Sequence, residues 1–380
     1  MSVPPLIAHI VFRFDVGGLE NGVVNLVNCL PQDEFRHVII ALTRATDFKA
    51  RINRSDVAVH ALDKQPGKDP AAYLRLYRLL RRLRPAVVHT RNYGTLDCQL
   101  VAFLARAPYR IHGEHGWDIH DPDGTNRKYQ QVRRALNPLI HRFITVSRDL
   151  ERWLLERVGI PAAKVTRICN GVDTGHFRPA GKTPGDLSPQ AVVVGSVTRF
   201  EPIKDPLNLV RAFVAARRRL AALGGAIDLR LLMVGDGPLR AAALAEIEAA
   251  GESASAWLPG GCDDVAGHYA NMHYYALGSR REGISNTVLE AMACGLPVIA
   301  SATGGNLELV DAGATGTLVP PGDTAALTDA LVAYASDPAL RERQGRAAHE
   351  RVEREYSLAR MVMSYRDVYR VACARVGVSA

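Results

Sequence analysis

Short apolar segments alternate with amphipathic, helix-like segments along the chain. This alternation occurs in the first half and starts again in the second half. Short apolar runs bounded by turn residues are typical of buried strands. Strands that alternate with helices form parallel sheets, with helices packed on the faces. The sequence therefore predicts an α/β fold. The expected strands cover residues 6–11, 38–42, 57–62, 86–89, 109–112, 143–147 and 165–169, and then 191–197, 229–234 and 298–300.

The length of the chain and one linker-like segment indicate two domains. A chain of 380 residues is too long for one ordinary hydrophobic core. Residues 178–190 contain three prolines, two glycines and few apolar side chains, which is typical of an interdomain linker. We therefore expect an N-terminal domain over residues 1–180 and a second domain that begins at residue 190.

Several classes of protein are disfavoured by the composition. No apolar run approaches the roughly 20 residues that span a bilayer. Residues 1–5 have neither the charged region nor the apolar region of a signal peptide, so we do not expect secretion. The six cysteines are scattered without metal-ligand spacing, as is typical of reduced thiols. Together these observations predict a cytoplasmic protein.

Positive charge is concentrated in the first half of the chain. Residues 1–180 hold 27 Lys+Arg and 17 Asp+Glu, whereas residues 181–380 hold 20 and 22. A basic half indicates an anionic partner, which could be a phospholipid surface, a phosphorylated acceptor or nucleic acid. Nucleic acid is the weakest of the three, because the charges are spread over several helices and no recognised nucleic-acid motif is present.

One expected helix carries much of this charge. Over residues 71–84, apolar side chains recur at helical spacing, and the other face carries Arg75, Arg78, Arg81 and Arg82. This pattern fits a crossover helix with a solvated basic face. It also fits a helix that contacts the inner face of an anionic membrane. The sequence leaves both interpretations open.

The segment at residues 281–300 is predicted to form a loop, a short helix, a turn and a strand. The residues from Ser285 to Thr287 are types that cap a helix, and a helix N-terminus attracts anions. Glu282 lies just before this helix start, and Glu290 lies about one turn inside the helix. Carboxylates accept hydrogen bonds from hydroxyl groups. A nucleotide diphosphate sugar, which is an anion with hydroxyl-rich groups on both sides, would fit between them.

Three other loops that follow expected strands carry candidate site residues. Gly17 and Gly18 open a helix and could approach a phosphate, although a plain tight turn fits equally well. Arg199 and Lys204 share one loop, where they could hold a diphosphate or could be ordinary surface cations. His115 could hydrogen-bond a hydroxyl, carry a proton or have only a structural role.

The adjacent acids Asp263 and Asp264 could suggest a divalent-metal site. Two neighbouring acids alone are a weak pattern, and the start of a helix explains them better. We therefore expect no bound metal.

These motifs resemble the retaining glycosyltransferases of the GT-B fold, in particular glycosyltransferase family 4. The resemblance covers nearly the whole chain. Its most specific part is the Glu-x7-Glu block at residues 282–290, with an Ala-Met-Ala-x-Gly-x-Pro-Val tail. Residues 89–95 and 278–283 further resemble a bacterial exopolysaccharide branch associated with PEP-CTERM and exosortase systems. The other matching segments are Gly17-Gly18, Asn170-Gly171-Val172-Asp173, Arg199 with Lys204, and Gly235-Asp236-Gly237-Pro238.

The resemblance implies two Rossmann-like domains that face a central cleft. The C-terminal domain, residues 190–357, would bind the nucleotide sugar, and the last segment, residues 358–380, would cross back to the N-terminal domain as a helix. The donor would be shared among residues of the second domain. Arg199 and Lys204 would hold its diphosphate, Glu282 its sugar hydroxyls, Glu290 its ribose diol, and Gly283, Ile284, Ser285, Asn286 and Thr287 its phosphates.

In the N-terminal domain the resemblance implies roles for Gly18 and His115. Gly18 would let this domain close over the diphosphate, and His115 would face the donor sugar. The implied reaction moves a hexose or N-acetylhexosamine from a UDP- or GDP-sugar with retention, and it requires no metal or other cofactor. The implied acceptor is a saccharide or a polyprenyl-phosphate-linked glycan in exopolysaccharide or cell-envelope synthesis.

One segment departs from the family pattern, and three other functions stay open. Residues 272–279 read Met-His-Tyr-Tyr-Ala-Leu-Gly-Ser, where an aspartate followed by Val-Phe-Val-Leu-Pro-Ser is usual. The segment is still recognisable as a strand, but its surroundings at the edge of the sheet are left open. The alternatives are a glycoside hydrolase, a nucleotide-sugar epimerase and a non-catalytic binding protein. A retaining hydrolase needs two carboxylates about 5–5.5 Å apart across one bond, whereas Glu282 and Glu290 straddle a helix start.

Overall fold

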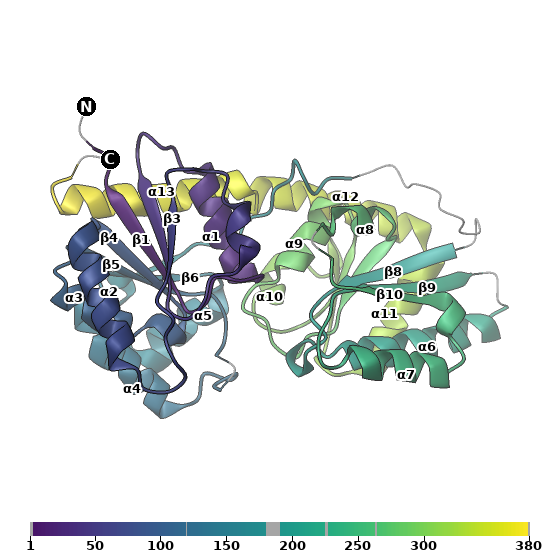
Figure 1. Cartoon of the computed structure of the whole chain (residues 1–380). Helices are drawn as coiled ribbons and strands as arrows, with labels where there is room; N and C mark the ends of the chain where they lie inside the picture. Colours follow the sequence, from purple (N-terminus) through teal and green to yellow (C-terminus); the bar gives the residue numbers. More distant parts are fainter. Residues whose placement is uncertain (1–2, 119, 180–190, 225–226, 263, 379–380) are drawn as a thin grey trace. The chain divides into compact units, whose positions relative to one another are not determined.

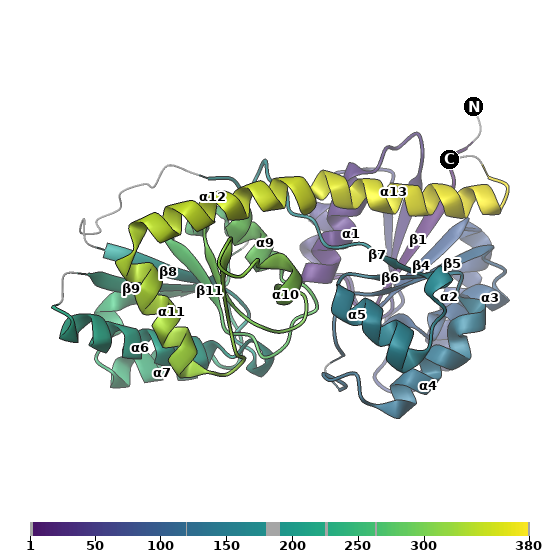
Figure 2. The same ribbon diagram turned by 180° about the vertical axis from the view of Figure 1, so that it is seen from behind.

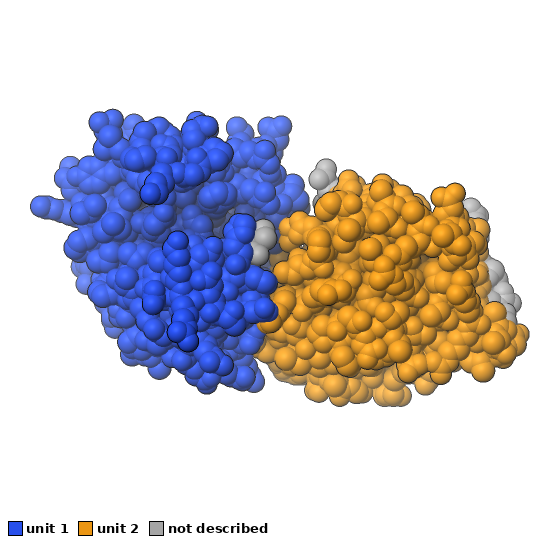
Figure 3. Space-filling view, turned by 90° about the horizontal axis from the view of Figure 1, so that it is seen from below, with its two compact units in different colours: residues 1–171, 358–380 blue, residues 172–357 orange. Residues whose placement is uncertain are grey.

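The computed structural model describes residues 3–118, 120–179, 191–224, 227–262 and 264–378. Within these ranges the chain divides into two compact units, which Figure 3 colours separately. Unit 1 comprises Met1–Gly171 and Leu358–Ala380, and unit 2 comprises Val172–Ser357. Most of the predicted linker, residues 180–190, lies outside the described residues.

Unit 1 is built on a parallel sheet. Its strands are β1 (Leu6–Val11), β2 (Arg36–Ala41), β3 (Ala58–Ala61), β4 (Val87–Arg91), β5 (Tyr109–Glu114), β6 (Arg142–Thr145) and β7 (Val165–Arg167). Their order across the sheet is β3-β2-β1-β4-β5-β6-β7, and every described pair runs parallel. The chain therefore builds outward from β1 in one direction and then from β4 in the other. This reversal creates a switch point between β1 and β4.

Helices cover both faces of this sheet (Figures 1 and 2). The helices α1 (Gly18–Cys29) and α13 (Leu358–Arg375) contact each other over one face. The helices α2 (Pro70–Leu83) and α3 (Cys98–Leu104) pack side by side over the other. Alternate residues of β1 enter the two cores, as the strand period of two requires. Unit 1 also contains α4 (Arg127–Leu136), α5 (Arg148–Trp153) and a π-helical turn at Leu154–Val158.

The C-terminal helix α13 is part of the core of unit 1. Tyr365 and Tyr369 are buried in one apolar cluster with residues of β1, β4 and β5. At the surface, Arg366 and Arg370 both form ion pairs with Glu34, which precedes β2. A helix at the end of the sequence thus completes a layer of the first unit.

Unit 2 has its own parallel sheet. Its strands are β8 (Ala191–Val197), β9 (Asp228–Val234), β10 (Ala256–Gly260), β11 (Tyr274–Leu277), β12 (Val298–Ser301) and β13 (Gly316–Val319). The order is β10-β9-β8-β11-β12-β13, so the switch point lies between β8 and β11. β11 pairs with both β8 and β12 and is an interior strand, which answers the question raised by the unusual segment at residues 272–279.

The helices of unit 2 pack on its sheet in the same way. They are α6 (Pro206–Ala222), α7 (Arg240–Ala249), α8 (Ala266–Ala270), α9 (Asn286–Ala293), α10 (Asn306–Leu309), α11 (Thr324–Ser336) and α12 (Pro338–Glu355). α6 contacts α11, and α9 contacts α12. Two Rossmann-like α/β units with parallel sheets confirm the predicted fold class. In the described ranges, no helix combines the length and apolar character needed to cross a membrane.

Candidate functional site

Two loops extend from the carboxyl ends of neighbouring strands at the switch point of unit 2. β8 ends at Val197 and β11 ends at Leu277, and the two strands are hydrogen-bonded neighbours. Ligands of open parallel sheets bind beyond the strand ends at such a point, because the connections diverge there. The loop after β8 carries Arg199 and Lys204, and the loop after β11 carries Glu282.

Lys204 and Glu282 form a close ion pair. Lys204 Nζ lies 2.6 Å from Glu282 Oε1, and Ser279 Oγ donates to the same oxygen at 2.7 Å. The side chain of Glu282 is 5% exposed and that of Lys204 is 19% exposed. A carboxylate buried to this degree needs a positive partner, because desolvation penalises an isolated charge. The structure therefore brings two of the predicted site residues into contact.

A second contact ties the same two loops together. The backbone N–H of Arg280 donates to the carbonyl oxygen of Ile203 at 2.9 Å, and its Nε donates to Asp205 Oδ2, also at 2.9 Å. Asp205 has a φ of 46°, in the left-handed region that is uncommon for a residue with a side chain. The surrounding contacts hold this conformation. Residues on both sides of Lys204 are thus anchored to the loop that carries Glu282.

The helix α9 begins at the predicted place. Ser285 caps it, because its Oγ accepts a hydrogen bond from Val288 N at 3.3 Å. Thr287 Oγ1 lies 3.2 Å from Ser285 Oγ and 2.7 Å from the hydroxyl of Tyr275 in β11. Tyr275 therefore fixes the first turn against the strand. The positive end of the helix dipole follows directly after Glu282 in the chain.

The other predicted phosphate-binding residues lie between Glu282 and α9. Gly283 is partly exposed and Ile284 is buried, while Asn286 is the first residue of the helix and is partly exposed. Their contact with a phosphate stays a prediction.

Two glycines that the sequence reasoning missed support this loop. Gly304 has a φ of 50°, and a Cβ at this position would overlap the carbonyl oxygen of Glu282. Gly305 N donates to the carbonyl oxygen of Gly283 at 3.1 Å. The available signal was a pair of adjacent glycines just beyond the strand β12. A third loop, after β12, therefore holds the backbone that carries Glu282.

Glu290 lies in the second turn of α9 and is oriented by a tyrosine. The hydroxyl of Tyr269 donates to Glu290 Oε2 at 2.8 Å and lies 3.2 Å from the carbonyl oxygen of Thr287. Burial, reinforced by the nearby Glu290 carboxylate, raises the pKa of Tyr269 well above its usual value, so the hydroxyl keeps its proton. Tyr269 was not predicted, because nothing in its sequence position points to Glu290.

Arg199 is not part of this cluster. Its side chain is 59% exposed, and its Nη1 lies 2.8 Å from Glu201 Oε1. In the part of the chain that the structure describes, no ion pair or hydrogen bond joins Arg199 to Lys204 or Glu282. Exposed arginines change rotamer within nanoseconds. The predicted contact between Arg199 and a diphosphate stays a prediction.

In unit 1, Gly17 and Gly18 form the start of α1. Gly17 precedes the helix in an extended conformation, and Gly18 is its first residue. The carboxylate of Glu20 occupies the space beside Gly17, so that a Cβ on Gly17 would overlap it. An acid is favourable at a helix N-terminus. A phosphate at this point would have to displace Glu20.

His115 follows β5 in unit 1. Its backbone N–H donates to Asn92 Oδ1 at 2.7 Å. Burial, together with the charges of Arg91 and His112, lowers the pKa of His115 to about 3. The imidazole is therefore neutral near pH 7. This fits a hydrogen-bonding role and disfavours the proton-carrying role that the sequence left open.

A buried ion pair fixes the strand end just before His115. Arg133 Nε lies 2.6 Å from Glu114 Oε1, and Arg133 Nη2 lies 3.1 Å from Glu114 Oε2. The guanidinium also lies over the rings of Tyr93 and Trp153, at 4.9 and 4.8 Å from the ring centres. Sequence reasoning missed Arg133, because no local pattern pairs this residue of α4 with Glu114, 19 residues earlier.

The predicted helix start around Asp264 is observed. Asp264 Oδ1 accepts a hydrogen bond from Ala266 N, the first residue of α8, at 3.1 Å. Asp263 lies outside the described residues. Within the described ranges, no group of three or more His, Cys, Asp or Glu side chains could hold a metal ion.

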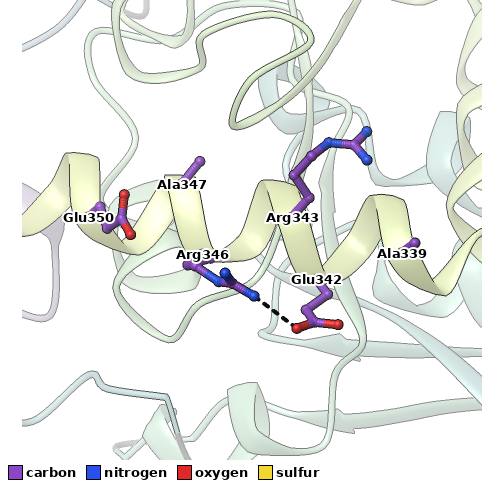
Figure 4. A pocket seen from close by; sticks show the side chains of 6 residues that line it. All are labelled: Ala339, Glu342, Arg343, Arg346, Ala347 and Glu350. Carbon is purple, nitrogen blue, oxygen red and sulfur yellow. Dashed lines mark hydrogen bonds and ion pairs between the residues drawn. The ribbon is translucent and has the colours of Figure 1, made fainter.

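A surface pocket on α12 contains none of the predicted site residues. It lies along one side of the helix, where Arg346 Nη2 donates to Glu342 Oε1 at 2.9 Å (Figure 4). Its lining residues are Ala339, Glu342, Arg343, Arg346, Ala347 and Glu350.

Two family profiles match this chain. The profile described as Glycosyltransferase Family 4 matches residues 16–176, and the profile described as Glycosyl transferases group 1 matches residues 188–337. The two ranges cover most of both units.

Among curated proteins, the chain is similar to the D-inositol 3-phosphate glycosyltransferase of Saccharomonospora viridis. The identity is 31% over 244 residues, which cover 61% of this chain and 56% of that protein. The chain is also similar to the UDP-Gal:alpha-D-GlcNAc-diphosphoundecaprenol alpha-1,3-galactosyltransferase of Escherichia coli, with 25% identity over 316 residues that cover 80% and 79% of the two chains. The chain spans about half the length of the D-inositol 3-phosphate glycosyltransferases that it matches.

Among solved structures, the fold is similar to that of Anabaena Alr3699/HepE in complex with UDP and glucose. The TM-score is 0.78 at 18% identity, and the match covers 96% of this chain and 98% of that chain. A glycosyltransferase from Rickettsia africae matches with a TM-score of 0.79 at 21% identity, over 97% and 98% of the two chains. At these identities the matches show that the folds are similar.

Two Rossmann-like units with these structural neighbours define a GT-B protein. The two matching profiles are more specific, and the chain belongs to glycosyltransferase family 4. The family resemblance predicted from the motifs is thereby confirmed, whereas membership of the exopolysaccharide branch stays a prediction.

Proposed function

We propose that the protein transfers a hexose or an N-acetylhexosamine from a UDP- or GDP-sugar to a saccharide or lipid-linked acceptor, with retention of configuration. The observation that carries the proposal is the contact between Lys204 and the buried Glu282 at the switch point of unit 2, just before α9. A cation, a carboxylate and a helix N-terminus in adjoining loops suit a ligand that combines a diphosphate with hydroxyl groups.

In the proposed reaction, the bond between the anomeric carbon and the diphosphate oxygen breaks, and a bond to the acceptor oxygen forms on the same face. The acceptor proton passes to the departing diphosphate. Lys204 and the start of α9 stabilise the negative charge that grows on this leaving group, and Arg199 adds to the stabilisation when it turns inward. Glu282 holds the sugar hydroxyls and Glu290 holds the ribose diol. No protein nucleophile is needed.

The names of similar proteins support the choice of substrates. The Anabaena structure contains UDP and glucose, and the E. coli relative is named for UDP-galactose and a diphosphoundecaprenol-linked acceptor. UDP-sugars are therefore the first donors to test, with GDP-sugars second. Lipid-linked glycans of the cell envelope or of an exopolysaccharide are the first acceptors to test.

Calorimetric titration with UDP-, GDP- and ADP-sugars, followed by turnover assays with lipid-linked and saccharide acceptors, tests this function. We expect one nucleotide sugar to bind, and NMR of the product to show a retained anomeric configuration. Donor binding without turnover on the whole acceptor panel would support a non-catalytic binding protein. Cleavage of an oligosaccharide in the absence of any nucleotide would support a hydrolase.

We also propose that unit 1 contacts an anionic membrane, where a lipid-linked acceptor would be found. The basic side of this surface lies on α2, where Arg78, Arg81 and Arg82 are exposed. The helix contains no acidic residue. Each basic side chain near an anionic bilayer contributes about 1 kcal/mol of attraction.

The apolar side of the surface lies on the neighbouring helix α3. Leu100, Phe103 and Leu104 recur at helical spacing and are 47%, 47% and 57% exposed. The guanidinium of Arg110 lies 5.4 Å from the centre of the Phe103 ring. Because α2 and α3 pack side by side over the same face of the sheet, the basic and the apolar groups lie on adjacent helices, and a combination of basic and apolar groups is typical of proteins that lie on a bilayer surface.

Vesicle co-sedimentation tests this surface. We expect the protein to bind vesicles that contain phosphatidylglycerol and to bind pure phosphatidylcholine weakly. The triple variant R78Q/R81Q/R82Q should lose up to about 100-fold in affinity for the anionic vesicles, and the variant F103S/L104S should lose affinity for both kinds. Equal binding by all three proteins would contradict the proposal, and so would binding to RNA in place of vesicles.

A further inference from the structure

The end of β4 buries a guanidinium among histidines. Arg91 is 3% exposed, and its Nη2 lies 3.1 Å from His9 Nδ1 and 3.3 Å from His89 Nδ1. His89 Nδ1 also lies 2.9 Å from the hydroxyl of Tyr369 on α13. Among the described residues, Arg91 forms no ion pair with a carboxylate. Its surroundings are neutral imidazole rings, a phenol and a backbone carbonyl.

The chemistry of Arg91 determines which nitrogen of each ring carries the proton. A guanidinium can only donate hydrogen bonds, so Nδ1 of His9 and Nδ1 of His89 must be the unprotonated nitrogens. Burial and the charge of Arg91 hold the pKa of both histidines well below the usual value, so each ring is neutral and carries its proton on Nε2. His9 can donate this proton to His37 Nδ1, which is 3.0 Å away.

His89 has no such acceptor in direct contact. Its Nε2 is buried and has no hydrogen-bond partner among the described residues, and the same is true of Nε2 of His115. Both atoms lie close to one point, the position that a Cβ on Gly113 would take, at 3.2 Å for His89 and 2.6 Å for His115. A buried N–H is normally satisfied by an acceptor or by a bound water. The absence of a side chain on Gly113 leaves the space for that contact.

We propose that Arg91 and His89 are positioning residues that fix the tautomer of His115. Because His89 donates from Nε2, a water bound between the two rings accepts from His89. The hydrogens of this water need an acceptor in the buried space, so it donates to Nε2 of His115, which then carries its own proton on Nδ1. The ring of His115 then offers an N–H from Nδ1 to an oxygen of the substrate. This inference rests on the proposed function, in which His115 binds a substrate hydroxyl. Arg91 and His89 act only through His115.

The nitrogen chemical shifts of histidine-labelled protein test the tautomer without any activity assay, and H115Q identifies the His115 signals. We expect the Nδ1–H tautomer of His115 in the unmodified protein. In H89F the ring shape is kept but the donor is lost, so the preference for this tautomer should disappear and kcat should fall about 10-fold, the worth of one hydrogen bond. H89Q retains an N–H donor, so it should recover part of the tautomer preference and part of kcat.

Two further variants separate this role from general damage to the core. G113A places a methyl group between the two rings with His89 intact, and it should change the His115 signals as H89F does. H37F is the matched control, because His37 lies on the His9 branch from Arg91, and it should leave the His115 tautomer and kcat unchanged. An Nε2–H tautomer of His115 in the unmodified protein, or an unchanged tautomer in both H89F and G113A, would overturn the inference. If the expected nitrogen chemical shifts are observed but the protein shows no transferase activity, the inference about the tautomer stands and the proposed function is rejected.

Discussion

Replacing Lys204 or Glu282 with alanine should lower kcat for sugar transfer at least about 10²–10³-fold, which is the usual effect of removing one preorganised group that stabilises transition-state charge. In the proposed reaction Lys204 stabilises the leaving group and Glu282 holds the donor sugar, and in the structure Glu282 also pairs with Lys204. Their 2.6 Å contact makes the two roles interdependent. The double variant should therefore be little worse than either single variant. Steady-state kinetics with the donor identified by calorimetry checks this.

The folded state of these variants has to be measured alongside their activity. Breaking a buried ion pair leaves one unpaired charge and can cost about 3–5 kcal/mol of stability. The double variant removes both charges, so it should unfold at a higher temperature than E282A or K204A while it stays inactive. R211A is a matched control, because Arg211 pairs with Glu246 on the surface of the same unit at 2.6 Å. Near-normal turnover in a folded K204A or E282A protein would rule out the site assignment.

Acidification should unfold unit 1 at a pH well above the range in which carboxylates titrate. Burial lowers the pKa of His37 and His115 to about 3, and it lowers the pKa of His9 and His89 well below the usual value. In the unfolded chain each histidine binds a proton below about pH 6.5. The folded unit excludes these protons, so its stability is full above about pH 6.5 and falls as the pH drops towards the folded pKa values.

The expected loss is large for a single domain. Each of the four histidines removes up to about 1.4 kcal/mol per pH unit, so the total loss approaches about 5.5 kcal/mol per unit. Three tryptophans make the measurement selective, since Trp117 and Trp153 lie in unit 1 and Trp257 lies in unit 2. Urea unfolding of a W257F protein, followed by fluorescence at pH 7.5, 6 and 5, reports on unit 1.

The variant H37F supplies the control for this pH dependence. It removes one of the four titrating rings, so the slope of unfolding free energy against pH should decrease by about 1.4 kcal/mol per unit. An unfolding free energy that is the same at pH 7.5 and pH 5 would show that these histidines are protonated in the folded state or accessible to solvent.

Much of the strand and helix pattern could be predicted because each unit repeats one simple pattern, although β10 and β13 were not among the expected strands. The apolar run at residues 191–197 became β8 with those bounds, and Ser285 caps α9. Both signals are local, since a buried strand and a capped helix are specified by a few consecutive residues. The place of Lys204, in a loop at the carboxyl end of a strand, followed from the same pattern.

The residues that support the site could not be predicted, because their partners are distant in the sequence. Tyr269 orients Glu290 from α8, and Gly304 leaves room for the carbonyl oxygen of Glu282. Neither contact is indicated by a periodic pattern or by neighbouring residues in the sequence. The neutral state of His115 could not be predicted from the sequence either, since its low pKa depends on burial and on Arg91 in a neighbouring strand. Side-chain packing between elements determines these properties.

Unit 1 is formed by two segments that are separated in the sequence, and this affects how the protein folds during synthesis. Unit 2 is one continuous segment, Val172–Ser357, whereas unit 1 needs α13, which the ribosome synthesises after the whole of unit 2. Until then His89 lacks the hydroxyl of Tyr369, and the sheet face that α13 covers exposes its apolar side chains. Such surfaces aggregate or bind chaperones during synthesis. The second unit can therefore reach its native state before the first, which reverses the usual order in which domains emerge and fold.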